Sequence, residues 1–445
     1  MQKGVLAKFK GIISLQMKNL NEVLNPNLVR LAPDPIRNEI AELNKRGFDP
    51  KQYPERDFTI GVPAPLPEDI AKISAEAALK FELTRPYEYP PFMGHEQLLE
   101  QIIRLEIAKK TGLGFEDKER MGLTLGASAA LEYVFSLFGP NRIILVQSPV
   151  WGTTYNFIAD SGNIGLPEAI FDEKGNFNKR SIGNFHSKYS HAAVYINLLG
   201  NPNPVLPSPR GFEDFLEFVK DTGWIIVSDD PYIFTMFDQE KISSYSILNS
   251  SEKVKARSIK IGSFSKVTKP ADRLGYVVIG KELAETMGNG WKMRLRNYGA
   301  GTPSVVQASV SAILEHDSNL NFLKANIERY QENIRTATDF LAELGCEVSG
   351  RRPDGAYFVF VKAPNQMDGK QFAYLLAEKA GLGFIPGSSF VPSEKHYLAT
   401  EFQGQYGEII GPHKDVLMHV RVGLGGKATP ENIEKAFKHA IKIMN

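Results

Sequence analysis

The chain is poor in cysteine and has almost no net charge. Its one cysteine, Cys346, excludes an intrachain disulfide framework and a cysteine metal cluster, and it suits a reducing compartment. The 52 Lys and Arg residues against 51 Asp and Glu residues give a formal net charge of +1, so the charge gives no argument for binding nucleic acid or a membrane surface. No apolar run approaches the roughly 18 residues of a membrane helix, and lysines interrupt the stretch from Met1 to Leu20. We therefore expect a soluble cytoplasmic protein.

Nucleotide and metal motifs are missing as well. Neither Gly-x-x-x-x-Gly-Lys-Ser/Thr nor Gly-x-Gly-x-x-Gly occurs in the sequence. The pair His186 and His191 has no carboxylate or thiol partner in a ligand pattern. We expect no metal site.

Apolar runs alternate with helical patterns along most of the chain. The composition, 42% hydrophobic and 23% charged over 445 residues, is that of a globular protein long enough for two domains. Several runs are continuously apolar, as in strands covered on both faces. The predicted strands are 122–125, 142–146, 192–199, 224–227, 258–261 and 276–279, and the predicted covering helices are 98–109, 129–138, 211–219 and 305–315.

This alternation predicts an α/β fold with three layers and a mostly parallel sheet. After about residue 325 the pattern changes to long charged helices at 326–344 and 430–444, with short strands at 357–361 and 418–422. We expect a large domain over residues 65–325. A smaller α+β domain would combine residues 326–445 with the N-terminal residues 1–64.

A lysine among hydroxyls is the most informative motif. Ser263-Phe264-Ser265-Lys266 follows a predicted strand, and Arg273 lies seven residues after the lysine. A lysine amine forms a Schiff base with an aldehyde, and a nearby cation favours its neutral, nucleophilic form. Two hydroxyls and a guanidinium suit a phosphate. The motif therefore fits a phosphorylated aldehyde cofactor, and the alternative is an exposed lysine in a polar turn.

Ligands gather at the carboxyl ends of strands in open α/β sheets. Other predicted strand ends of this chain carry residues that could bind the same cofactor. Each also has a structural explanation without function: a helix start, a core aromatic residue or a turn. The small residues Gly126-Ala127-Ser128 at a helix start suit a phosphate, and Trp151 can stack on a ring. The carboxylate of Asp229 can pair with a protonated ring nitrogen, and an amide of the segment Asn201-Pro202-Asn203-Pro204 can bond a ring oxygen.

In these motifs the chain resembles the pyridoxal-phosphate-dependent aminotransferases of fold type I, the class I and II group that includes aspartate aminotransferase. The resemblance runs from about Gly61 to Arg421. The spacing of seven between Lys266 and Arg273, with Pro270 between them, is most similar to the branch of 2-aminoadipate and kynurenine aminotransferases.

The resemblance implies a role for each matching residue. Lys266 would form the Schiff base with pyridoxal 5′-phosphate (PLP) and move the proton at the substrate Cα. Asp229 would pair with the ring nitrogen and Tyr232 would bond the phenolic oxygen, while Trp151 would cover the ring. The phosphate contacts would come from Ala127, Ser128, Ser263, Ser265 and Arg273, and from Tyr89 of a neighbouring subunit, which implies a homodimer.

The same resemblance implies the substrate site. Arg421 would bind the α-carboxylate beside the backbone of Gly61. The chain departs from the family at Asn201-Pro202-Asn203-Pro204, where relatives have Asn-Pro-Thr-Gly, so either Asn201 or Asn203 would face the cofactor; the spacing to Asp229 favours Asn201. It departs again at Ala271-Asp272, where relatives commonly have Gly-Leu and where the acidic side chain would weaken phosphate binding or face solvent.

The implied activity is a ping-pong transfer of an amino group from an L-amino acid to a 2-oxo acid. A PLP lyase, such as a carbon-sulfur β-lyase, would use the same cofactor motifs and is the alternative. A regulator with an aminotransferase-like body is disfavoured, since only about 60 residues precede Gly61 and the charge is near neutral. Arg294 or Arg296 would contact a second carboxylate of a dicarboxylic donor, and His95 would lie at the rim of the site; its alternative is a packing role.

Overall fold

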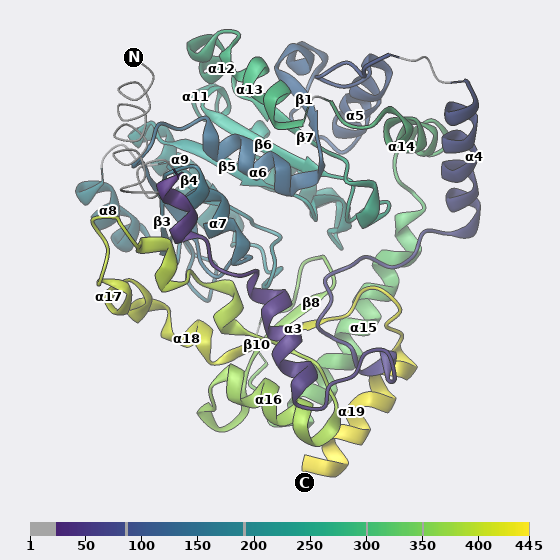
Figure 1. Cartoon of the computed structure of the whole chain (residues 1–445), viewed down its shortest axis with the longest axis vertical. Coiled ribbons are helices and arrows are strands. Elements are labelled where there is room, and N and C mark those ends of the chain that lie inside the picture. Colours follow the sequence, from purple (N-terminus) through teal and green to yellow (C-terminus); the bar gives the residue numbers. More distant parts are fainter. Residues whose placement is uncertain (1–23, 85–87, 190–192, 300, 349–350, 445) are drawn as a thin grey trace, which may run out of the picture.

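The computed structural model describes residues 24–84, 88–189, 193–299, 301–348 and 351–444 (Figure 1). Residues 1–23, His191 and Ala192, which fall within the predictions above, lie outside these ranges. Across the described ranges, none of the helices has the length and apolar character to cross a membrane.

A seven-stranded sheet lies in the upper half of Figure 1, with the strand order β1-β7-β6-β5-β4-β2-β3. The strands from β3 to β6 in this order run parallel, whereas β7 is antiparallel to both β6 and β1. The architecture is therefore α/β with a mostly parallel sheet, as the sequence predicts. The strands are β1 (Met121–Thr124), β2 (Ile143–Gln147), β3 (Ile164–Glu168), β4 (Ala193–Ile196), β5 (Ile225–Asp229), β6 (Ser258–Ser263) and β7 (Gly275–Ile279).

The edge strand β3 is missing from the sequence prediction. Gly165 and Pro167 interrupt its apolar pattern, and proline is depleted in strands. β3 pairs only with β2, with Pro167 opposite Val146. An edge strand tolerates proline because the missing N–H can face away from the ladder.

Alternation along the strands divides the core into two layers. On β5, Ile226 packs in the cluster on one face of the sheet and Val227 in the cluster on the other. Asp229, two residues after Val227, shares the Val227 face, because side chains alternate along a strand. Helices α6 (Gly126–Ser136), α7 (Thr153–Asp160) and α13 (Gly290–Gly299) cover that face, and α5 (Glu96–Ala108), α9 (Pro209–Thr222) and α14 (Ser304–His316) pack in the opposite layer.

Helix α9 shows how local sequence sets a boundary. Ser208 caps its N-terminus, accepting a hydrogen bond of 3.0 Å from the Gly211 N–H, and Pro209 occupies the first turn. Gly223 ends the helix in the left-handed conformation, with φ of 68°. The helix is therefore longer at both ends than the predicted range 211–219.

A three-stranded antiparallel sheet, β8-β10-β9, lies below the first sheet in Figure 1. An apolar core lies between this second sheet and the helices around it and consists of buried residues from 43–58 and 334–440. The elements are β8 (Phe358–Lys362), β9 (Ile385–Pro386), β10 (His419–Gly423), α3 (Pro35–Lys45), α15 (Leu323–Glu343), α16 (Gly369–Ala380) and α19 (Pro430–Met444).

Shorter elements connect and cover these layers. Helix α4 (Glu68–Thr84) packs along α14 at the outer edge of the molecule (Figure 1). The other helices are α8 (Lys179–Lys188), α10 (Ile242–Tyr245), α11 (Glu252–Ala256), α12 (Lys281–Met287), α17 (Tyr406–Ile410) and α18 (Lys414–Leu417), with 3₁₀ turns that include η1 (Pro26–Arg30), η9 (Gly387–Phe390) and η10 (Glu394–Tyr397).

Candidate active site

Five strand ends meet at one edge of the large sheet. Strands β2, β4, β5 and β6 are parallel, and β1 runs in the same direction as β6, so their carboxyl ends share this edge. Ligands bind at such an edge in open α/β sheets. The residues at or just after these ends are Ala127 and Ser128 (β1), Trp151 (β2), Asn201 (β4), Asp229 and Tyr232 (β5), and Ser263, Ser265 and Lys266 (β6).

Lys266 lies in the turn after β6. Its Nζ donates a hydrogen bond of 2.9 Å to the backbone oxygen of Gly61 and lies 5.4 Å from the centre of the Tyr232 ring. Burial, and then the positive charges of Arg421 and Arg273, lower the pKa of Lys266 to about 8. A larger fraction of neutral amine is therefore available at neutral pH, as a nucleophile or a base requires.

Arg421 on β10 brings a buried cation to the same place. Its side chain is 1% exposed, and burial lowers its pKa to about 10. Nη1 donates 2.8 Å to Oδ1 of Asn201, and Nη2 donates to the backbone oxygen of Thr59. Nε finds no hydrogen-bond partner within the described ranges. A buried guanidinium with a free N–H is suited to an anion, because an unpaired buried donor is costly.

Gly61 joins these two groups. Its carbonyl accepts the Lys266 hydrogen bond, and an added Cβ would lie 3.6 Å from Nη1 of Arg421 and 3.1 Å from the Phe358 ring. The segment from Thr59 to Gly61 therefore contacts both the amine and the guanidinium. Because Gly61 has no side chain, room remains beside the guanidinium.

Asp229 ends β5 as a buried carboxylate, 6% exposed. Oδ2 accepts a hydrogen bond of 2.8 Å from the hydroxyl of Tyr195, whereas Oδ1 has no partner in the described part of the chain. Burial raises the pKa of Asp229 to about 7, with Asp230 adding to the rise and the Tyr195 hydrogen bond and Lys266 opposing it. One carboxylate oxygen is thus buried and open to a donor from a ligand.

A group of hydroxyl, backbone and guanidinium donors surrounds the start of α6. An added Cβ on Gly126 would lie 3.0 Å from the guanidinium of Arg273, so this side chain lies against the helix N-terminus. Nη2 of Arg273 donates 3.3 Å to the oxygen of Leu125. The hydroxyl of Ser265 is buried and has no partner among the described residues. This donor group, completed by Ser263 and the α6 residues Ala127 and Ser128, suits a phosphate.

The two aromatic residues have different surroundings. Trp151 is half-buried and packs against Phe157, with ring centres 6.0 Å apart. Tyr232 is 4% exposed, lies beside Tyr357 and Phe358 at 5.8 and 5.6 Å, and has a pKa raised by burial. Tyr232 therefore keeps its proton and can act as a hydrogen-bond donor.

Other candidate residues lie away from this group within the single chain. Tyr89 is 97% exposed. His95 precedes α5 and its Nε2 lies 2.8 Å from the Ser304 hydroxyl. Arg294 donates 3.0 Å to Ser136 at the opposite end of α6 from Gly126, and Arg296 is exposed.

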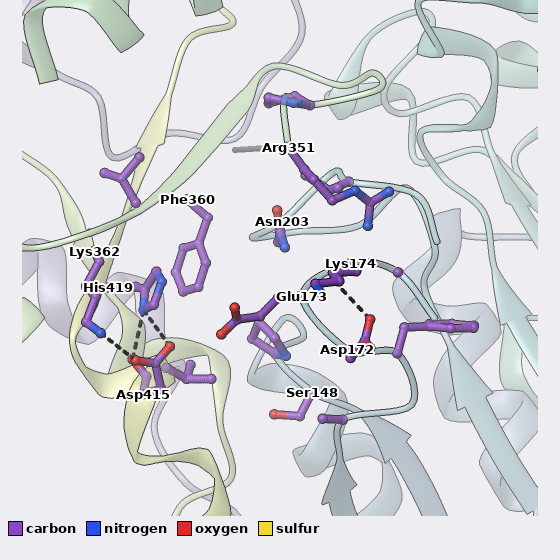
Figure 2. Close-up of a pocket in the computed structure, with 18 of the residues that line it drawn as sticks. Ser148, Asp172, Glu173, Lys174, Asn203, Arg351, Phe360, Lys362, Asp415 and His419 are labelled. Atoms are coloured by element: carbon purple, nitrogen blue, oxygen red, sulfur yellow. Dashed lines mark hydrogen bonds and ion pairs between the residues drawn. The ribbon is translucent and has the colours of Figure 1, made fainter. Parts of the chain in front are cut away.

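Asn203 lines a cavity of about 680 Å³ (Figure 2). The walls come from the loops after β2 and β3 and from β8 and the segment before β10. Lys266, Asp229 and Arg421 are not among its lining residues. The structure thus brings Asn201 to Arg421 and leaves Asn203 in a different cavity.

Three residues that contribute to the site were not predicted from the sequence. Tyr195 lies inside an apolar strand, so its hydroxyl had no visible partner. Asn197 donates its side-chain N–H to the backbone oxygen of Asp229 and accepts 3.2 Å from the N–H of Asn201. Thr59 contributes only its backbone oxygen. Asn197 lies inside the predicted strand 192–199, whereas the observed β4 ends at Ile196, so the sequence prediction did not place this asparagine at a strand end.

The family model for class I and II aminotransferases matches residues 67–395 of this chain. The chain belongs to this family. As a PLP-dependent aminotransferase it acts on amino acids and 2-oxo acids, and the resemblance seen in the sequence is confirmed.

Curated relatives carry the same activity in their names. Aromatic-amino-acid aminotransferase 2 of Thermococcus litoralis is 23% identical over 81% of this chain and 91% of its own. The chloroplastic LL-diaminopimelate aminotransferase of Arabidopsis thaliana is 26% identical over 87% of this chain and 84% of its own. These aminotransferase names do not favour the lyase alternative.

Solved structures show the same fold. Aspartate aminotransferase of Thermus thermophilus matches with a TM-score of 0.74 at 18% identity, covering 94% of this chain and 99% of that one. The α-aminoadipate aminotransferase LysN of the same organism matches with a TM-score of 0.73 at 18% identity, covering 96% and 98%. The fold is therefore that of the fold type I aminotransferases.

The site geometry fits PLP. The unpartnered Oδ1 of Asp229 can accept the N–H of a protonated pyridine, and the unpartnered Ser265 hydroxyl lies in the donor group that suits a phosphate. The lowered pKa of Lys266 favours reaction with an aldehyde. This aminotransferase thus presents a matching group for each end of the cofactor.

Proposed function

We propose that this aminotransferase transfers an amino group from an L-amino acid to a 2-oxo acid at a site formed by Lys266, Asp229 and Arg421. The observation that carries the proposal is the contact of one backbone segment with both essential cations: Gly61 O accepts from Lys266, and Thr59 O accepts from Arg421. Transfer of the amino group from an α-amino acid requires both groups: the amine of Lys266 beside the Cα and the guanidinium of Arg421 on the carboxylate.

Each residue has a separate task. When bound, PLP supplies an electron-withdrawing ring that stabilises negative charge at the substrate Cα. Lys266 holds the cofactor and carries the proton to and from Cα. Arg421 grips the carboxylate by two donors, beside Gly61 and Asn201, and this orients the Cα–H bond toward the amine.

The remaining residues hold the cofactor. Asp229 keeps the ring nitrogen protonated, Tyr232 donates to the phenolic oxygen and Trp151 covers the ring. The phosphate is bound by Arg273 and by the hydroxyl and backbone groups of Ala127, Ser128, Ser263 and Ser265.

The central assignment is tested by Lys266→Ala. The purified variant, incubated with PLP, should lack the visible absorbance band of covalently held cofactor and should not release an oxo acid from any amino acid. Lys269→Ala is the matched control and should behave as wild type. Lys269 lies three residues away, and its Nζ bonds Ser74. A normal absorbance band in Lys266→Ala would overturn the assignment.

The amino donor is defined by a single-turnover screen. Relatives are named for aromatic amino acids, LL-diaminopimelate and aspartate or prephenate, so their names do not agree on one donor. Each amino acid is added alone to the PLP-loaded protein, and loss of the bound-cofactor band identifies the donors. Release of ammonia and pyruvate without an oxo-acid acceptor would instead indicate a lyase.

We also propose a homodimer with composite sites. The support is the outer face near α4, where Leu79, Leu83 and Tyr89 are 61%, 77% and 97% exposed, since large exposed apolar groups mark interfaces. Tyr89 would reach the partner's phosphate group. Mixing Tyr89→Phe with Lys266→Ala subunits should produce hybrids with one intact site, and activity above that of either variant alone would support this; sedimentation as a monomer would contradict it.

The domain division remains part of this proposal. A large domain over residues 65–325 and a small domain over 326–445 with 1–64 are supported by the separate small-domain core. Tyr397 and Phe402 nevertheless pack in the large-domain core, and the Tyr397 hydroxyl donates 2.9 Å to Gly165. A cytoplasmic location is proposed from the single buried thiol, Cys346.

A further inference from the structure

The buried tyrosine Tyr195 lies directly behind the proposed ring-nitrogen partner. Tyr195 is on β4, is 1% exposed and donates 2.8 Å to Oδ2 of Asp229, itself 6% exposed. Its ring packs against Phe135, with centres 5.9 Å apart. The hydroxyl thus lies in a fixed place.

The two oxygens of Asp229 are therefore not equivalent. Oδ2 is occupied by the Tyr195 hydroxyl, and Oδ1 has no partner among residues that the structure describes. The backbone oxygen of Asp229 is held separately by Asn197. With both of these bonds made, the carboxylate can turn only its Oδ1 toward a ligand.

We infer that Tyr195 is a positioning residue for the cofactor ring: its hydroxyl orients Asp229 and keeps this carboxylate ionised, so that Oδ1 accepts the ring N–H. The inference rests on the proposed role of Asp229 and adds to it a residue outside the family motifs quoted above.

The charges around Asp229 show why such a donor is needed. Burial raises the pKa of this carboxyl to about 7, and Asp230, the next residue on β5, raises it as well. Lys266 from the β6 turn and the Tyr195 hydroxyl from β4 act in the opposite direction. The pKa of Tyr195 is itself far above its usual value because of burial, so the hydroxyl remains a donor.

Removing the hydroxyl should raise the pKa of Asp229. A carboxyl group with a raised pKa is protonated over a wider range of pH. As the pH falls, the ionised form of Asp229 would therefore be lost at a higher pH than in the wild type. Each unit of rise lowers the ionised fraction about tenfold at pH values below the pKa and has no effect well above it. The defect should therefore depend on pH, which a packing defect does not.

The test uses 4′-deoxypyridoxine 5′-phosphate, which keeps the ring nitrogen and the phosphate but has no aldehyde to react with Lys266. Its dissociation constant is measured by calorimetry between pH 6 and pH 9 on the cofactor-free protein. Tyr195→Phe should bind about tenfold more weakly than wild type at pH 6 and equally well at pH 9.

Tyr155→Phe is the matched control. Tyr155 is also 1% exposed and packs in the same cluster, but its hydroxyl has no hydrogen-bond partner in the described ranges. Its removal should leave affinity unchanged at every pH. Equal binding by Tyr195→Phe at pH 6, or a loss that stays constant from pH 6 to pH 9, would overturn the inference.

Asp229→Asn separates this inference from the proposed function. If Asp229 binds the ring nitrogen, Asp229→Asn binds the probe more weakly than wild type, and adding Tyr195→Phe causes no further pH-dependent loss. Unchanged affinity in Asp229→Asn would overturn the role of Asp229 itself. A pH-dependent loss that persists in the double variant would overturn only the route through Asp229.

Discussion

Replacing Arg421 by lysine should weaken substrate binding without unfolding the protein. The guanidinium is 1% exposed, with Nη1 on Asn201 and Nη2 on the Thr59 carbonyl. A lysine retains a positive charge but presents one point donor in place of a planar fork. The variant should therefore lose one of two hydrogen bonds to the substrate carboxylate.

The size of the loss follows from the bond removed. A hydrogen bond to a charged group contributes about 1.5 to 3 kcal/mol, and each 1.36 kcal/mol is about tenfold in rate or binding. The expected decrease in kcat/KM for the amino donor is thus about 10- to 160-fold. Since the carboxylate is held in both the ground state and the transition state, most of the decrease should appear in KM.

The assay is the half-reaction with a saturable amino donor, followed by the absorbance of the bound cofactor. Arg30→Lys is the matched control, because Arg30 is also buried, at 4% exposure, and bonds the backbone oxygens of His396 and Asn163. It should lower stability and leave KM unchanged. An unchanged KM in Arg421→Lys, or an equal rise in Arg30→Lys, would refute the reasoning.

Three further outcomes can be measured. Lys260→Met should lower the free energy of unfolding in urea by about 3 to 5 kcal/mol, because the Glu106 carboxylate, 2.7 Å from Nζ and 0% exposed, would lose its cation and, among the described residues, keep only the Tyr276 hydroxyl as a donor; no loss would contradict this. Gly61→Ala should raise KM for the amino donor, since its Cβ would lie 3.1 Å from a ring carbon of Phe358 on β8. Gly407→Ala should leave KM unchanged, because a Cβ at Gly407 would have nothing within 4 Å. In cofactor-free protein, the rate at which Lys266 captures PLP should rise with pH and level off above about 8, the lowered pKa of its amine; a rate still climbing tenfold per unit at pH 10 would indicate an ordinary lysine.

The strand ends could be predicted because their signals are local. An apolar run followed by a polar or small residue is visible without any partner, so Asp229 and Ser263 fell within two residues of a predicted end. Helix α6 begins three residues earlier than predicted, at Gly126, whose φ of 75° only glycine adopts freely. The predicted fold class is confirmed for the same reason, since it rests on the order of such runs.

The contacts inside the site could not be predicted, because they join distant residues. Asn201 and Arg421 are 220 positions apart, and Lys266 and Gly61 are 205 apart. Which oxygen of Asp229 is occupied depends on how β4 and β5 align, with Val194 opposite Ile226. Burial, which sets the pKa of every group in the site, is also a property of the assembled layers.

The charges of the site explain why these groups tolerate burial. Lys266 feels the positive charges of Arg421 and Arg273 and the carboxylate of Asp229, and burial opposes the charge on Lys266, Arg421 and Asp229. A phosphate monoester carries a charge of about −1.5 to −2, and the substrate carboxylate adds another negative charge. The two guanidinium groups have the sign that a phosphate and a substrate carboxylate require, and they lower the pKa of the Lys266 amine. The cations proposed to bind the two anions are thus the same ones that favour the neutral, reactive form of the lysine.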